Sequence, residues 1–408
     1  HVLSSLDDIA WLLNIRGNDI AYCPLVLSYA IVYNNSVELF ADIRKFSDDI
    51  INLLAENQVK IYPYEDIYRK VSEMTSEDKL LLDSAIMNYS LYQAISKETV
   101  IVDKQNPEIL MKSVKNETQA ENLRKAHLKD AVAHTKFMYW LKKNIGRVEI
   151  TELSASARLE GLRAEQEHFL GPSFGPISAY GEHGAIVHYS ADEKSNVPLK
   201  EGKLFMTDTG GHYLEGSTDI TRTVALGEVG NIEKEHFTLV ARAMLRLANT
   251  VFLYGCSGAN LDCIAREVFW KEGLNFNHGT GHGVGYLLNI HEGPINFRWK
   301  EGERPAPALE ENMVITDEPG IYIEGSHGIR LENELLVRKT VKNEYGQFMN
   351  FEILTYVPID LDAILPEKMN TEEKEMLNHY HKQVYEKVSP YLSEEERIWL
   401  KEYTRAVK

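Results

Sequence analysis

The 408-residue chain lacks several features that mark membrane, secreted and nucleic-acid-binding proteins. It has no apolar run close to the ~18 residues that a membrane-spanning helix needs. Its three cysteines, Cys23, Cys256 and Cys263, are too few for a disulfide scaffold and favour a reducing compartment. Positive charge is scarce, because 44 Lys and Arg face 61 Asp and Glu, for a net charge of −17. We therefore expect a cytoplasmic protein that binds neither nucleic acid nor a membrane.

The length and apolar content are sufficient for two domains. Residues 1–113 have the pattern of a compact α/β domain, in which short apolar strands are separated by turn residues such as Asn34 and Asn35. Amphipathic periodicity predicts helices over residues 46–60 and 64–74. We expect this N-terminal part to fold as one unit.

A second domain follows. Asn116 with Gln119 three residues later has the pattern of a helix N-cap, and the periodicity after it predicts a long helix to Lys143. Glycine-punctuated strands then alternate with helices, and residues 371–408 are charged and helical. We place a domain boundary before the long helix and expect a helical extension at the C-terminal end.

Asp208 and Asp219 lie in two strand-like runs that flank a short turn. A hairpin centred on Tyr213-Leu214 would place the two aspartates directly opposite each other, with Cβ atoms about 4.5–5.5 Å apart. Two like charges at that distance destabilise a hairpin unless a cation lies between them. The alternative is a hairpin shifted by one residue with both aspartates exposed, and this segment alone does not distinguish the two.

A glycine-rich segment at 278–294 carries three histidines: His278, His282 and His291. Two histidines four residues apart can belong to a zinc-binding helix, but no Glu follows the first and the glycines disfavour a helix. The dinucleotide pattern fails too, because Val284 stands where its third glycine belongs. We therefore predict a close backbone approach that presents imidazoles to a site, in preference to three structural histidines.

Acidic residues in two further segments complete a candidate metal site. Glu318 precedes a proline, which favours an extended conformation, and a predicted strand over 328–335 carries Glu332. Either glutamate alone is more often a surface residue. Pooled with the earlier segments they form a set of four carboxylates and one imidazole: Asp208, Asp219, Glu318, Glu332 and His282. Such a set suits two divalent ions of the manganese or cobalt type better than a thiolate-bound structural zinc.

These motifs resemble the ligand series of the pita-bread metallopeptidases, and within that family the cytosolic long-form aminopeptidase P (Xaa-Pro aminopeptidase) group. Further stretches that resemble this group lie at residues 6–17, 184–189, 278–285, 289–294 and 377–381. The resemblance covers nearly the whole chain. It implies an α/β (α+β) fold with three parts: a partial creatinase-like domain at 1–113, a pita-bread catalytic domain at 114–370 and a C-terminal helical extension at 371–408.

The chain begins at His1 and runs straight into a helical pattern at residues 6–13, so we expect the natural N terminus to lie upstream. The resemblance implies one further N-terminal domain there, and it implies a homodimer.

The resemblance also implies a role for each site residue. Five residues hold metal: Asp208, Asp219, His282, Glu318 and Glu332. Among these, Asp219 and Glu332 bridge the two ions, and Glu318 also shuttles a proton. Three histidines contact the substrate without binding metal: His188, His278 and His291. Two residues support the site from outside the ligand set: Tyr322 and Arg330.

The implied reaction releases the first residue of a peptide that has proline second. Two divalent ions, Mn²⁺ in the first place with Co²⁺ or Zn²⁺ as alternatives, supply the attacking hydroxide. A prolidase would share every ligand but cleave dipeptides alone. A methionine aminopeptidase would lack a domain such as residues 1–113. A non-catalytic binding protein with this fold normally has a broken ligand set, whereas all five ligand positions are intact here.

Overall fold

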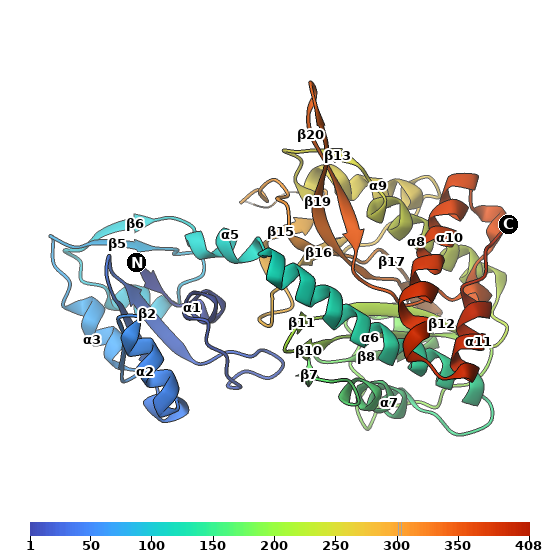
Figure 1. Cartoon of the computed structure of the whole chain (residues 1–408), viewed down its shortest axis with the longest axis horizontal. Coiled ribbons are helices and arrows are strands. Elements are labelled where there is room, and N and C mark those ends of the chain that lie inside the picture. The colour runs from blue at the N-terminus through green and yellow to red at the C-terminus, as the bar shows by residue number, and fades with distance from the viewer. Residues whose placement is uncertain (301, 303) are drawn as a thin grey trace. The chain divides into compact units, whose positions relative to one another are not determined.

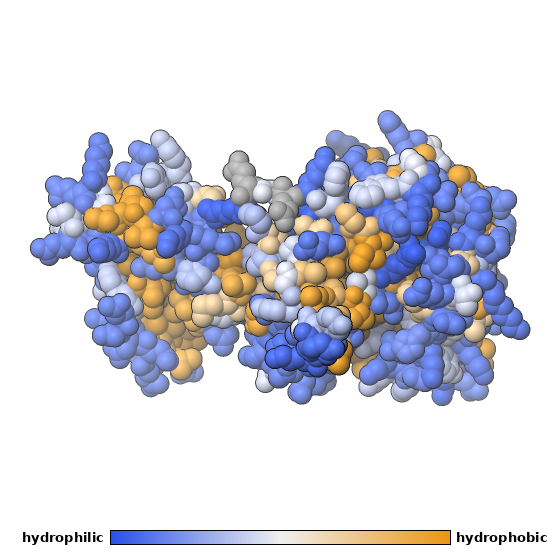
Figure 2. Space-filling model, turned by 90° about the horizontal axis from the view of Figure 1, so that it is seen from above, coloured by the Kyte–Doolittle hydropathy of each residue, from blue (hydrophilic) through white to orange (hydrophobic). Residues whose placement is uncertain are grey.

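The computed structural model describes residues 1–300, 302 and 304–408, which form two compact units, His1–Lys112 and Ser113–Lys408 (Figure 1). Each unit has apolar clusters of its own. Apolar side chains also reach the surface of both units (Figure 2). Among the described residues, no helix is long and apolar enough to cross a membrane.

The first unit contains a four-stranded sheet and a separate parallel pair. The four-stranded sheet has the order β1 (Val2–Leu3), β2 (Ser28–Val32), β3 (Val37–Ala41) and β4 (Val59–Tyr62). The parallel pair is β5 (Lys79–Leu82) with β6 (Val100–Asp103). The helices are α1 (Leu6–Leu13), α2 (Asp48–Glu56), α3 (Asp66–Ser72), α4 (Tyr89–Ala94) and α5 (Pro107–Ser113), whose last residue lies past the boundary. The helix expected over 46–60 is shorter, because Gln58 adopts φ 60° and the chain continues as β4.

Long helices surround the sheets of the second unit (Figure 1). They are α6 (Glu117–Asn144), α7 (Glu152–Ala164), α8 (Asn231–Ala248), α9 (Gly258–Trp270), α10 (Thr371–Val388) and α11 (Glu394–Tyr403). The predicted N-cap of α6 is confirmed, since Asn116 and Gln119 exchange side-chain-to-backbone hydrogen bonds of 2.9 and 3.0 Å. The helix ends one residue beyond the predicted Lys143.

Four sheets make up the rest of the second unit. One three-stranded sheet has the order β11 (Gly216–Ser217), β10 (Gly211–Tyr213), β7 (Phe169–Pro172). A second three-stranded sheet has the order β12 (Ile220–Leu226), β9 (Lys203–Thr209), β8 (Ile177–Tyr180). The six-stranded sheet runs β13 (Phe252–Leu253), β20 (Gly346–Ile353), β19 (Asn333–Asn343), β16 (Val314–Asp317), β14 (Gly281–Gly283), β15 (Glu292–Phe297). A last pair joins β17 (Gly320–Ile323) to β18 (His327–Arg330). The main core lies between sheets and helices and includes Phe137 of α6, Phe205 of β9, Met244 of α8 and Leu335 of β19.

The hairpin that carries the two aspartates has a different register from the expected one. Asp208 lies opposite Thr221, not opposite Asp219, and the turn centres on residues 214 and 215. Gly216 closes this turn with φ 134°, which favours glycine. The first alternative is therefore wrong, and the second is right about the shift of the turn by one residue but wrong about the exposure of the aspartates. Both aspartates are nevertheless buried, with 3% exposure for Asp219 and 7% for Asp208.

The continuous strand expected over 328–335 is also interrupted. β18 ends at Arg330 and pairs with β17, whereas β19 begins at Asn333 and pairs with β16 and β20. Glu332 therefore lies at the junction between two sheets. This break lets residues from one short segment reach the aspartate hairpin from different directions.

Candidate metal centre

A cavity of about 610 Å³ in the second unit is lined by most of the residues proposed from the sequence. They are His188, Asp208, Asp219, His278, His282, His291, Glu318, Arg330 and Glu332. Tyr322 is not part of the lining and lies behind Arg330, to which it is hydrogen-bonded. The cavity also takes in Arg298, which the sequence did not single out.

Carboxylate and imidazole groups converge at the floor of this cavity in three overlapping sets. The ligand atoms of each set lie within 4.8 Å of one another, and the sets are Asp208–Asp219–Glu332, His282–Glu318–Glu332 and Asp219–His282–His291. Asp219, Glu332 and His282 each belong to two sets, and of these three the two carboxylates have two oxygens apiece to offer. The described side chains therefore offer donors for two adjacent cations.

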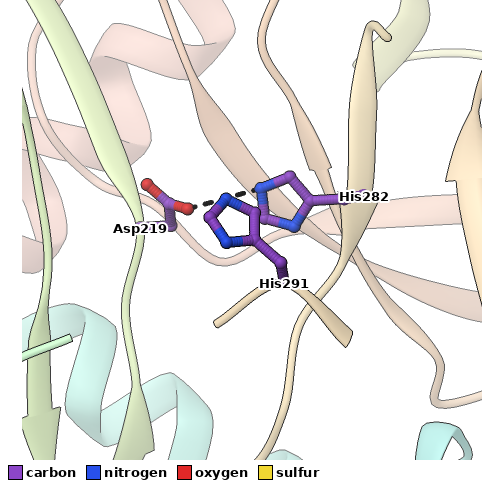
Figure 3. A group of neighbouring side chains, drawn as sticks. All are labelled: Asp219, His282 and His291. Atoms are coloured by element: carbon purple, nitrogen blue, oxygen red, sulfur yellow. Dashed lines mark ion pairs between the residues drawn. The ribbon is translucent and has the colours of Figure 1, made fainter. Parts of the chain in front are cut away.

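His282 is aimed at the carboxylates by its own strand. Its Nδ1 donates to the carbonyl of Gly283 at 3.0 Å. The lone pair of Nε2 therefore faces Asp219 at 3.5 Å (Figure 3), and Glu318 lies 3.7 Å from the same nitrogen. A metal-binding histidine is commonly held in this way, through its other nitrogen. The segment is strand β14 and not a helix. Its glycines permit close approach to neighbouring strands, since a Cβ at Gly281 would lie 1.8 Å from the carbonyl oxygen of Thr316.

The carboxylates of this cluster repel one another, so bound cations would stabilise their ionised forms. Burial, together with the neighbouring carboxylates, raises the pKa of Asp219 and of Glu332 well above its usual range. Burial also raises the pKa of Glu318. Asp208 Oδ1 and Glu332 Oε1 are buried, and neither has a hydrogen-bond partner among the described residues. Orphaned oxygens in a crowd of carboxylates are suited to divalent cations with oxygen-rich coordination, so this donor set fits a two-metal centre.

A chain of hydrogen bonds supports Asp208 from behind. Arg330 Nη2 donates to Asp208 Oδ2 at 2.5 Å, and its Nη1 donates to the Tyr322 hydroxyl at 2.7 Å. Nδ1 of His278 donates to the carbonyl of Gly279 at 2.7 Å, so Nε2 accepts from the Tyr322 hydroxyl at 2.8 Å. Burial lowers the pKa of His278 to about 4 and raises the pKa of Tyr322 to about 12. His278 is thus a neutral member of this chain, with both ring nitrogens engaged.

The other two histidines occupy different positions. His291 lies beside His282, with ring centroids 4.4 Å apart, and its ligand atom belongs to the set with Asp219 (Figure 3). Burial and the neighbouring His282 lower the pKa of His291 to about 4. His188 is exposed at the cavity and belongs to none of the three sets formed by described residues. Its neighbour Tyr189 anchors this stretch by donating to the buried carboxylate of Glu152 at 2.9 Å.

Sequence reasoning missed several residues around the ligands. The Thr221 hydroxyl donates to Glu332 Oε2 at 2.8 Å, and Thr316 Oγ1 accepts from the His282 amide at 3.1 Å. Alternation along the strand gave a signal for Thr221, two residues after Asp219. The sequence gave no such signal for Arg298, which lines the cavity from the end of β15.

Three family models together match almost the whole chain. The model for metallopeptidase family M24 matches residues 121–339, and the one for the C-terminal region of peptidase M24 matches residues 347–407. The model for the creatinase/prolidase N-terminal domain matches residues 1–119. Together the three matches cover the residues of the acidic cavity and the regions before and after them in the sequence.

Individual relatives match over the full length of the chain. A probable Xaa-Pro aminopeptidase P of Paracoccidioides brasiliensis (strain Pb03) is 36% identical, covering 100% of this chain and 69% of the relative. Aminopeptidase P1 of Arabidopsis thaliana is 34% identical, covering 100% of this chain and 70% of the relative. A solved X-prolyl aminopeptidase from Caenorhabditis elegans, described as a cytosolic enzyme with a di-nuclear active site, has a TM-score of 0.93 at 34% identity, covering 100% of this chain and 68% of that one.

Proposed function

The chain belongs to metallopeptidase family M24, with a creatinase-type domain before a pita-bread catalytic domain, and on this premise we propose that it is a metal-dependent Xaa-Pro aminopeptidase. It releases the first residue from peptides whose second residue is proline. The observation that carries the proposal is the set of four carboxylates and one imidazole, three of them buried and two half-buried, with two orphaned oxygens, at the floor of a cavity. The similarity to aminopeptidases P along the whole chain supports the choice of substrate.

We assign the two ions to five residues: Asp208, Asp219, His282, Glu318 and Glu332. Bound ions of this kind supply an activated water and polarise the scissile carbonyl. Mn²⁺ is our first choice, with Co²⁺ or Zn²⁺ as alternatives, because oxygen ligands with one nitrogen suit Mn²⁺. Arg330 and Tyr322 keep Asp208 aimed at the cavity through their hydrogen bonds.

The remaining groups act on the peptide itself. His188 and His291 donate hydrogen bonds to the carbonyl oxygen as negative charge develops on it. Glu318 carries the proton to the leaving proline nitrogen. His278 bounds the pocket for the proline ring through its ring face, since its nitrogens are held by Gly279 and Tyr322.

The test compares Arg-Pro-Pro with Arg-Ala-Ala under saturating Mn²⁺. We expect release of free arginine from Arg-Pro-Pro with a kcat/KM far above that for Arg-Ala-Ala. Comparable values would contradict the Xaa-Pro assignment. The dipeptide Arg-Pro serves as the control for a prolidase, which would cleave it and leave Arg-Pro-Pro intact. Release of an intact N-terminal dipeptide would indicate a different enzyme.

We further propose that residues 114–370 carry catalysis, that residues 1–113 are part of a creatinase-like domain and that residues 371–408 form a helical extension. The protein acts in the cytoplasm as a homodimer. Light scattering coupled to gel filtration tests the dimer, and fractionation of cells that express the protein tests its location. A monomer at micromolar concentration, or recovery in a membrane fraction, would contradict these two assignments.

A further inference from the structure

Glu334 is a fifth buried carboxylate beside the cluster, and it belongs to none of the three ligand sets formed by described residues. Its Oε1 accepts a hydrogen bond of 2.6 Å from the backbone amide of Asp219. Its Oε2 lies 3.1 Å from Nε2 of His127, which is on helix α6. Both side chains are completely buried, so this contact is shielded from solvent.

The carboxylate of Glu334 is destabilising where it lies, because it repels the neighbouring carboxylates. Its negative charge is one of the causes that raise the pKa of Asp219. An apolar residue of similar size would avoid this repulsion, because buried charges are poor stabilisers compared with well-packed hydrophobic groups. Its benefit lies in the bond that it makes, since a hydrogen bond from an amide to a carboxylate is roughly twice as strong as a neutral one.

The hydrogen bond to Glu334 is made by a backbone amide that lies outside the β-ladders. Asp219 lies between β11, which ends at Ser217, and β12, which begins at Ile220, so its backbone is outside both ladders. Asp219 nevertheless belongs to two ligand sets and must be held accurately. Glu334 supplies an acceptor for its amide from β19, more than a hundred residues along the chain.

We infer that Glu334, which lies against His127, is a positioning residue that fixes the main chain of Asp219 for metal binding. The inference rests on the proposed function, since it takes Asp219 as a ligand. It assigns neither Glu334 nor His127 to the metal. It predicts instead that removing the Glu334 acceptor makes the backbone of Asp219 more mobile while the protein stays folded.

Strand β12, which begins one residue after Asp219, offers a matched control near its other end. Asp360 is also buried, accepts from the backbone amide of Ala225 in β12 at 2.8 Å, and pairs with Lys142 of α6 at 2.6 Å. This arrangement links β12 to α6 through a buried carboxylate, much as Glu334 lies between the Asp219 amide and His127 of α6. Ala225 carries no ligand, so a purely structural role is common to both sites and metal positioning is particular to Glu334.

The experiment compares Glu334→Leu, Glu334→Gln and Asp360→Leu in the full chain. The first measurement is amide hydrogen exchange at Asp219 in the chelated protein, and the second is Mn²⁺ titration by calorimetry. We expect Glu334→Leu to exchange faster at Asp219 and to bind Mn²⁺ about 10–100-fold more weakly. Glu334→Gln keeps an acceptor oxygen and should stay within a few-fold of wild type in both measurements. Asp360→Leu should lower the melting temperature and leave Mn²⁺ affinity unchanged.

Wild-type exchange and wild-type Mn²⁺ affinity in folded Glu334→Leu would overturn the inference, as would an equal loss of affinity in Asp360→Leu. If the wild-type protein bound no Mn²⁺, the proposed function would fail, and amide exchange alone would still decide whether Glu334 holds the Asp219 backbone. Where Glu334→Leu does not fold, His127→Asn takes its place. We expect weaker Mn²⁺ binding for that variant, and unchanged binding would overturn the inference.

Discussion

Two groups of buried carboxylates in the second unit differ in the charge that lies beside them. In the first group each carboxylate meets a cation from the chain: Asp130 with Arg163, Asp262 with Arg266, Glu292 with Lys115 and Asp360 with Lys142, at 2.6–2.7 Å. In the second group Asp219, Glu318 and Glu332 face one another and Asp208. Arg330 contacts the second group, and its bond goes to Asp208.

The comparison shows how a fold can prepare a metal site. Removing a charge from water is costly unless a partner compensates for it. The first group finds this partner within the chain, so its charges are compensated in the metal-free protein. The second group is held together by surrounding structure while its charges repel one another, so compensation has to come from outside the chain. Four predictions test this difference, beginning with the largest expected effect.

Chelation should abolish aminopeptidase activity and leave the first group of carboxylates unaffected. Mn²⁺ or Co²⁺ should restore activity better than Mg²⁺, which suits imidazole poorly. Asp219→Asn should retain less metal than Asp208→Asn, because Asp219 belongs to two ligand sets. Elemental analysis alongside the peptidase assay provides the measurement. Full activity in a preparation shown to be metal-free would refute the two-metal proposal.

Breaking one pair of the first group should damage stability instead of metal binding. Asp130→Ala leaves the guanidinium of Arg163 buried without its carboxylate, which typically costs about 3–5 kcal/mol. Urea unfolding of the chelated protein measures this loss. The exposed pair Arg69–Glu73 is the control, since Glu73→Ala should cost less than about 1 kcal/mol. Similar losses in the two variants would remove the distinction between buried and exposed pairs.

The two substrate histidines should affect turnover more than metal content. His188→Ala and His291→Ala should each lower kcat by about 10²–10³, the usual effect of losing one oxyanion donor. Metal analysis of each purified variant is decisive for His291, because its ring lies within ligand distance of Asp219 and His282. Purification of His291→Ala with only one equivalent of metal would make His291 a ligand.

Neutralising a member of the second group should stabilise the metal-free protein. The raised pKa of Glu332 means that its ionised form is disfavoured in the native state. Native-state stability from this group is therefore present below its ordinary pKa and is lost as pH rises through the raised value. Glu332→Gln should gain about 1 kcal/mol at pH 8, and the gain should shrink toward pH 5. Denaturant unfolding at both pH values is the measurement, and a gain that is larger at pH 5 would have the wrong sign.

Features that depend on residues close together in the sequence could be predicted from the sequence. The N-cap at Asn116 depends on contacts across three residues, and it formed as predicted. The glycines around His282 correctly excluded a helix, although the close approach that they allow is to neighbouring strands. The ligand types and their order along the chain were also readable, because each motif contains its own residues.

The sequence by itself determined the family, the fold class and the chemical character of the site, since these follow from which residues occur and in what order. Tertiary structure alone decided the hairpin register at Asp208, the engagement of both nitrogens of His278 and the contact between Glu334 and His127. The register depends on the turn that Gly216 closes, and the other two depend on partners from distant segments: the hydroxyl of Tyr322 and His127 on helix α6. Such contacts form when elements pack in three dimensions, and no local pattern encodes which groups will meet.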